Sequence, residues 1–173
     1  MQQPIDTTNP VSGKIVVAAM AALAEIYLHN LSEETSKGKR ARAASGLYNG
    51  DLPYGYCNPE KGKGGESNWA VPAIVPEAAR SIRRAFELYA TGQYSDARIA
   101  RVLNDEGYRI VSKWQPQGGP FGKDTLTAML ANPFYVGWVV QPTGDGGSNR
   151  RDDAHLLRGR HEPIIDQALF DQA

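Results

Sequence analysis

The segment from Val11 to Ala44 constrains the fold most strongly, because it can form one uninterrupted helix. Only Gly13 and Gly38 oppose a helix there, and each costs about 1 kcal/mol relative to alanine. Such a helix is about 50 Å long. Its first half, Ile15–Leu31, is apolar on nearly every side and must be covered by protein on several sides. The rest of a 173-residue chain is too small to cover it, so we expect a partner to contribute.

The same helix contains a stretch that imitates a targeting signal. The longest continuous apolar run, Ile15–Ala24, is shorter than the roughly 20 residues that a membrane span needs. Lys14 and the sequence Ala22-Leu23-Ala24, which looks like a cleavage site, are typical of a secretory signal, but the helical pattern continues to Leu31. A lone cysteine, Cys57, agrees with a reducing compartment. We therefore expect a soluble, cytoplasmic protein without membrane contact.

Three shorter helices are predicted downstream. Glycine and proline crowd the interval 47–75, which is linker composition with turns. Apolar spacing predicts a first short helix over 76–91. Ser95 is the expected N-cap of the second helix, and Gly107 ends it. Asp124 is the expected N-cap of the third helix, Asp124–Ala131.

A small β-hairpin is expected near the C-terminal end. Phe134–Gln141 is aromatic and β-branched and predicts a strand, and His155–Arg160 is the expected return strand. Between them, 142–153 has the composition of a flexible loop, and Asp166 is placed to cap a last helix. The predicted fold class is α+β and mainly helical. A long N-terminal helix is followed by a three-helix, helix-turn-helix-like domain with a small β-hairpin.

The charge distribution is more informative than its total. Nineteen Lys and Arg balance nineteen Asp and Glu, and a net charge of zero argues at first sight against a nucleic-acid partner. However, four basic residues and no acid lie within six positions, namely Lys37, Lys39, Arg40 and Arg42. Small residues follow, up to Ser45. A thin basic stretch suits a DNA groove, whose walls are lined by phosphates. The alternative is a solvated helix end, with Lys37 paired to Glu33.

The third short helix is a candidate recognition helix. In a helix-turn-helix unit the later helix enters the major groove. Its exposed positions are then Lys123, Thr125, Thr127 and Ala128, which suit phosphates, base edges and thymine methyl groups. The alternative is a plain three-helix core without a ligand.

Two further groups of arginines have different expectations. Arg83 and Arg84 lie three or four residues before Glu87, which favours a salt-bridged solvent face. Arg150 and Arg151 lie in the expected flexible loop and are better placed to reach a phosphate.

No catalytic or metal site is predicted. His29, His155 and His161 are far apart in the sequence and show no metal-ligand spacing. A single cysteine excludes an internal disulfide and a zinc site of four cysteines, or of two cysteines and two histidines, within this chain. We therefore expect no catalytic residue, no metal ligand and no cofactor.

Several short motifs resemble those of the large serine recombinases of the phage-integrase and transposon type. Together they cover nearly the whole chain, and their order and spacing are more specific than any single motif. The matching segments are Asp6–Val11, Ala24-Glu25, Leu31-Ser32, Gly50–Tyr56, Pro76–Ala78, Phe86–Tyr89, Ile99–Asn104, Asn132–Gly137 and His161–Asp166.

This resemblance implies the middle part of such an enzyme. Residues 1–46 resemble the end of the catalytic domain and the long connecting, dimerising helix, and 47–75 resemble the linker. Residues 76–173 resemble the "recombinase" DNA-binding domain, which we expect to be truncated at its C-terminal end. The family cuts and rejoins DNA through a serine in a catalytic domain. That domain and the zinc ribbon are expected to be missing here.

The resemblance also implies partners and contact residues. Double-stranded DNA is the expected partner, and Lys37–Ser45 match the part of the helix that crosses the minor groove. The linker motif adds Tyr54 and Tyr56 to the DNA-binding candidates. Self-association through Ile15–Leu31 is expected, as a dimer, or a tetramer in the intact enzyme.

Three functions are compatible with these patterns. The first is the DNA-binding part of a site-specific serine recombinase that recognises recombination attachment sites. The second is a free-standing helix-turn-helix transcription regulator. The third is a helical interaction protein that does not bind DNA. The salt dependence of duplex binding separates the third function from the other two. An adjacent reading frame for a serine catalytic domain favours the first over the second.

Overall fold

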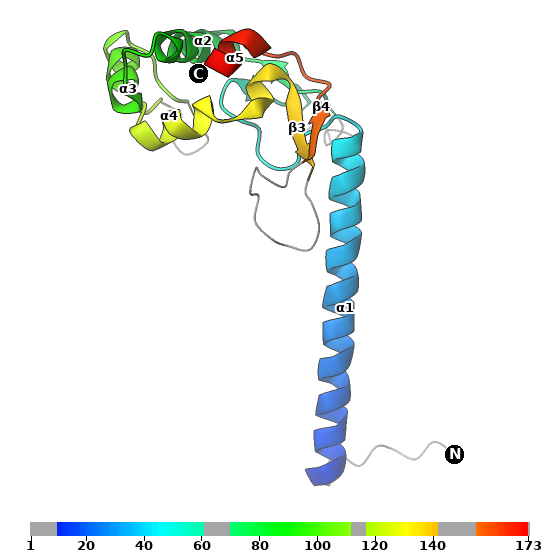
Figure 1. Cartoon of the computed structure of the whole chain (residues 1–173). Coiled ribbons are helices and arrows are strands. Elements are labelled where there is room, and N and C mark those ends of the chain that lie inside the picture. The colour runs from blue at the N-terminus through cyan, green and yellow to red at the C-terminus, as the bar shows by residue number, and fades with distance from the viewer. Residues whose placement is uncertain (1–9, 61–69, 112–116, 142–154, 173) are drawn as a thin grey trace.

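The computed structural model describes residues 10–60, 70–111, 117–141 and 155–172. Helix α1, Pro10–Ala44, is continuous as predicted and extends away from the other elements like an arm (Figure 1). Its large apolar side chains are exposed, with exposed fractions of 64% for Ile15, 65% for Leu23 and 51% for Leu31. Among the residues that the structure describes, none therefore covers the apolar half of α1.

The length and composition of Gly13–Ala44 would also allow this helix to cross a membrane. Buried helices of soluble proteins and secretory signals share these two properties. The expectation of no membrane contact, which considered only the longest unbroken apolar run, therefore stays a prediction.

Three short helices form the body of the domain. They are α2 (Pro76–Ala90), α3 (Asp96–Asp105) and α4 (Lys123–Leu130), and each packs against the other two. Ser95 occupies the N-cap position of α3, as predicted. The described part of the chain is mainly helical with two small antiparallel sheets, which confirms the predicted fold class.

The prediction that Asp124 caps the third helix is wrong. The N-cap residue is Gly122, whose carbonyl already accepts the first helical hydrogen bond, at 3.1 Å from the Leu126 nitrogen. The Asn104 side chain fixes the preceding residue by bonding both the N–H and the carbonyl of Phe121. The chain therefore enters the helix earlier than the sequence indicates, and Asp124 lies inside the first turn.

The predicted strand Phe134–Gln141 is only partly correct. Its first half belongs to a 3₁₀ helix, η2 (Pro133–Val136), and only β3 (Trp138–Gln141) is a strand. The Asn132 side chain accepts a hydrogen bond from the Phe134 N–H and starts the 3₁₀ turn, and Gly137 ends it at a φ of 89°. Strand β4 (His155–Arg158) pairs antiparallel with β3, so the hairpin is confirmed.

Parts of the interval 47–75 pack into the same core. Strands β1 (Tyr56–Cys57) and β2 (Ala73–Ile74) pair antiparallel within it. Leu47 and Tyr56 are buried, and Gly55 lies so close to α2 that a Cβ atom there would be 2.3 Å from the Ile82 Cδ1 atom. These segments are packed like domain residues, although their composition is that of a linker. The last element is α5 (Gln167–Gln172).

The C-terminal end of α1 is anchored to this core. Ala43 and Leu47 are fully buried, and the Gly46 carbonyl accepts a hydrogen bond from the Arg160 N–H at 2.9 Å. Arg42 Nε donates to the Tyr48 carbonyl at 2.8 Å. The basic end of the helix is therefore held against the domain by burial and by hydrogen bonds.

His161 lies at the centre of an aromatic cluster. Its ring stacks on Phe134 at 3.6 Å between centroids, and its Nε2 atom donates to the Phe134 carbonyl at 2.7 Å. The Nδ1 atom is buried and has no hydrogen-bond partner in the described part of the chain. Burial, and to a smaller degree the charge of Arg158, lowers the pKa of His161 below its ordinary value. The folded protein therefore favours the neutral imidazole.

We expect the free energy of unfolding to fall as the pH drops from about 7 to about 5. Because the folded state lowers the pKa of His161, the unfolded state binds more protons below the ordinary histidine pKa of about 6.5. Stability is therefore lost as the pH falls through that value. Urea unfolding at several pH values measures the effect. His161→Phe keeps a stacked ring and should flatten this part of the profile, whereas an unchanged profile would contradict the role of His161.

Candidate nucleic-acid interface

The basic end of α1 is only partly neutralised by neighbouring acids. Lys37 lies 2.9 Å from Glu34 and 4.0 Å from Glu33, and the hydrogen bond to Glu34 raises the pKa of Lys37. The alternative interpretation, in which a basic residue at the helix end pairs with a preceding glutamate, therefore holds for Lys37. Lys39 and Arg40 are exposed, and neither forms an ion pair with any other described residue. These two cations are available to an external anion.

Two other predicted contact residues stabilise the helix end. Arg42 is half-buried, and its Nε atom holds the Tyr48 carbonyl. Ser45 is exposed, but its hydroxyl donates to the Ala41 carbonyl at 3.0 Å. Asn49 donates to the Lys39 carbonyl at 2.9 Å and closes the turn. Arg42 and Ser45 therefore shape the surface that presents Lys39 and Arg40.

The two tyrosines of the linker motif point into the domain. Tyr56 is 7% exposed and donates to the Glu162 carbonyl at 2.8 Å, and burial raises its pKa. We therefore withdraw Tyr56 as a DNA contact, because reaching DNA would require unpacking the core. Tyr54 is half-buried, and its hydroxyl lies 3.1 Å from the Arg109 carbonyl and 3.3 Å from the Ser81 hydroxyl. Its hydroxyl is used inside the protein.

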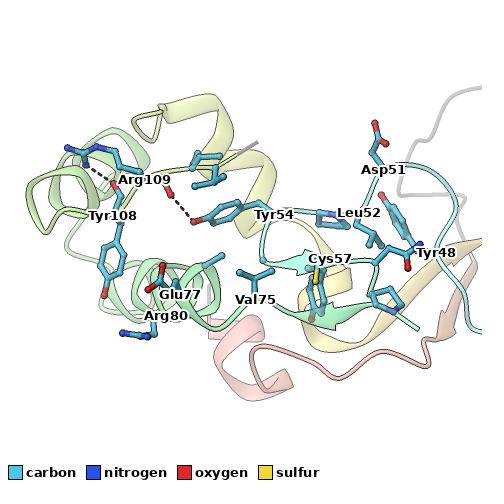
Figure 2. Close-up of a pocket in the computed structure, with 18 of the residues that line it drawn as sticks. Tyr48, Asp51, Leu52, Tyr54, Cys57, Val75, Glu77, Arg80, Tyr108 and Arg109 are labelled. Carbon is cyan, nitrogen blue, oxygen red and sulfur yellow. Dashed lines mark hydrogen bonds between the residues drawn. The ribbon is translucent and has the colours of Figure 1, made fainter. Parts of the chain in front are cut away.

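Tyr54 lies along an open groove of about 1140 Å³. Figure 2 shows this groove between the loop that carries Tyr54, the start of α2 and the Tyr108–Arg109 segment. Its charges are mixed, since Arg80 and Arg109 are accompanied by Glu77 and other acids. Arg109 Nη1 also donates to two backbone carbonyls, those of Asn104 and Tyr108. The groove therefore lacks the excess of free cations that a phosphate backbone requires.

Helix α4 presents a second exposed surface. All four predicted contact positions are exposed, namely Lys123, Thr125, Thr127 and Ala128. The opposite face is buried in the core through Leu126, Met129 and Leu130. Thr127 Oγ1 donates to the Asp96 carboxylate, a contact that the sequence pattern did not indicate because 31 residues separate the two.

The arginines of α2 are largely used within the domain. Arg84 lies 2.8 Å from Glu106 and 4.0 Å from Glu87, which confirms the salt-bridged face for this residue. The expected Arg83–Glu87 pair is not formed, because Arg83 Nε donates to the Ile164 carbonyl at 2.9 Å. Two other predicted contacts, Arg150 and Arg151, lie outside the described residues.

Two separate surfaces thus remain as candidates. One is the basic end of α1 around Lys39 and Arg40, and the other is the exposed face of α4. Figure 1 shows α1 and α4 at opposite ends of the domain, so the structure does not bring these residues together. A ligand that contacts both surfaces must be long and must carry negative charge at the α1 end.

The architecture is that of a helical arm anchored to a small α+β domain. The sequence model described as Recombinase matches residues 76–173, and the chain belongs to this family. The resemblance to serine recombinases that the motifs indicate is therefore confirmed, at the level of the recombinase DNA-binding region. No curated protein sequence matches the chain.

Two solved structures share the fold. One is described as the crystal structure of an LSR–DNA complex, with 20% identity and a TM-score of 0.55, and the similarity covers 80% of this chain and 36% of that chain. The other is described as "Sequence Requirements of the Listeria innocua prophage attP site", with 19% identity and a TM-score of 0.55. That similarity covers 80% of this chain and 48% of that chain. This chain therefore spans less than half of either protein.

Proposed function

We propose that this chain is the DNA-binding part of a site-specific serine recombinase and recognises recombination attachment sites. Membership of the Recombinase family supports this function. Of the two similar structures, one is described as an LSR–DNA complex and the other concerns the sequence requirements of a prophage attP site. The observation that carries the proposal is the pair Lys39 and Arg40, which are exposed near the point where α1 joins the domain and form no ion pair with any described residue. The parent enzyme would cut and rejoin DNA through a serine outside this chain.

The two candidate surfaces have different tasks in this proposal. Cations such as Lys39 and Arg40 bind phosphates, which supply affinity and register but no sequence information. The face of α4 reads base edges in the major groove, as the second helix of a helix-turn-helix unit does. The anchored end of α1 fixes the separation of the two surfaces and therefore the length of DNA between them.

Selection from a pool of random duplexes tests this function. The whole chain is mixed with the pool, bound duplexes are recovered, and their sequences are compared with the starting pool. We expect a defined sequence to be enriched. The affinity for this sequence should exceed the affinity for random duplex by about a thousandfold or more. Binding without sequence preference would contradict attachment-site recognition. If a serine catalytic domain is encoded next to this chain, the recombinase is favoured over a free-standing regulator.

A second proposal concerns the apolar half of α1. Most of its large apolar side chains are exposed, and water contact with such a surface is unfavourable. We propose that copies of this chain associate through Ile15–Leu31, as a dimer, or a tetramer in the intact enzyme. A cytoplasmic location is part of the same proposal, since the partner surface is protein rather than lipid.

We expect the mass measured by light scattering to rise with concentration to at least twice the chain mass of 18.8 kDa. Leu23→Lys combined with Leu28→Lys should shift the chain toward the monomer, because both side chains are more than 60% exposed and lie in the apolar half. Thr35→Lys adds a charge to the polar half and serves as the control. A wild-type chain that stays monomeric at high concentration would contradict the association.

A further inference from the structure

Asp124 is an exposed carboxylate at the start of α4. It occupies the second position of α4, after the N-cap Gly122 and the first helical residue Lys123. Among the described residues, no hydrogen bond or ion pair involves its side chain. The capping role that its sequence position indicates is filled by Gly122. The Asp124 carboxylate is therefore free to meet a ligand.

The geometry of α4 places Asp124 at the centre of its outer face. Leu126, Met129 and Leu130 form the buried face of the helix. At about 3.6 residues per turn, Asp124 and Ala128 lie one above the other on the opposite side. A surface that docks on α4 meets these two residues first, and the small Ala128 side chain allows a close approach.

The neighbouring Thr127 is less available to a ligand. Its hydroxyl has one proton, and this proton is directed at the Asp96 carboxylate, while the oxygen also lies 3.1 Å from the Lys123 carbonyl. Thr127 therefore cannot donate to a phosphate without losing its bond to Asp96. The central contact of the α4 face is thus a hydrogen-bond acceptor with a negative charge, which repels phosphates and favours a donor.

We propose that Asp124 determines sequence specificity by accepting a hydrogen bond from a base amino group in the major groove, with cytosine preferred. This inference rests on the proposed function, because it requires DNA against α4. Cytosine offers only its amino donor in the major groove. Adenine pairs its amino donor with the N7 acceptor, and guanine and thymine present acceptors, which repel a carboxylate. An unmatched base leaves the charge of Asp124 unpaired, which is an efficient way to reject wrong sequences.

The random-duplex selection tests this inference when it is repeated with Asp124→Asn and Asp124→Ala. We expect the wild-type chain to prefer cytosine at one position by about tenfold. Asp124→Asn should change that preference to adenine, because an amide both donates to N7 and accepts from the amino group. Asp124→Ala should leave that position without a preference and keep the preferences at the others.

Glu77→Gln provides the matched control. Glu77 is an exposed acid at the second position of α2, so it has the same relation to its helix dipole as Asp124 has to that of α4. If Asp124 only stabilises its helix, Asp124→Asn and Glu77→Gln lower the urea midpoint alike and leave every base preference unchanged, which would overturn the inference. If the wild-type chain selects no sequence at all, the proposed function itself fails.

Discussion

Replacing both Lys39 and Arg40 with glutamine is expected to weaken binding to duplex DNA on the order of 50-fold at about 0.1 M salt. Each phosphate contact releases counterions and contributes about 0.9 to the slope of log affinity against log salt. Losing two contacts should therefore make the slope shallower by about 1.8. Fluorescence anisotropy with a labelled duplex at several salt concentrations measures both quantities.

Lys14→Gln is the control for this charge change. Lys14 is exposed near the N-terminal end of α1, just before the apolar half, and Figure 1 shows that this end of the helix lies far from the domain. Its replacement changes the net charge while leaving the basic end intact, so we expect the salt slope to stay the same. If the double variant retains the wild-type slope, Lys39 and Arg40 do not contact phosphates and the groove-crossing role is rejected.

Truncating Phe134 to alanine is expected to lower the free energy of unfolding by about 3–5 kcal/mol. Phe134 is 1% exposed, stacks on His161 and makes edge contacts with Tyr48 and Tyr56 at 4.8 and 4.9 Å. Its loss leaves a cavity at the junction of η2, the C-terminal segment and the loop that anchors α1. Because domains of this size are stable by only about 5–15 kcal/mol, a large part of the stability disappears.

Urea unfolding followed by tryptophan fluorescence measures this loss. Val111→Ala is the comparison, since Val111 is an apolar residue that is 60% exposed and lies outside α1. An exposed side chain contributes little to stability, so its truncation should change the free energy of unfolding by less than about 0.5 kcal/mol. Similar effects of the two substitutions would contradict the packing of Phe134 in the core.

The helices were predictable because their determinants are local. The continuity of α1 follows from the absence of proline between Pro10 and Ala44, because the two glycines, Gly13 and Gly38, cost only about 1 kcal/mol each. The start of α4 was not predictable in the same way, because it depends on the side chain of Asn104, which binds Phe121 from 17 residues away. Aromatic and β-branched composition likewise did not distinguish η2 from a strand, since the Asn132 cap decided the backbone conformation.

In the candidate interface, too, contacts between neighbours in the sequence were predictable and contacts between distant segments were not. The pairing of Lys37 with a preceding glutamate follows from helix spacing and is present. The burial of Tyr56 depends on the carbonyl of Glu162, 106 residues later, and no local pattern indicates it. Arg83 is similar, since its partner is the backbone of Ile164. Sequence patterns therefore identified exposed charges well and misjudged residues whose partners come from distant segments.

The salt dependence of duplex binding by the unaltered chain tests the central claim most directly. If the basic end of α1 and the face of α4 bind DNA, the affinity must fall steeply as salt increases. We predict that the slope of log affinity against log salt is about −2 or steeper, because Lys39, Arg40 and any further phosphate contacts each contribute to it. A slope near zero, or no binding at low salt, would contradict the account and favour a helical protein that binds other proteins.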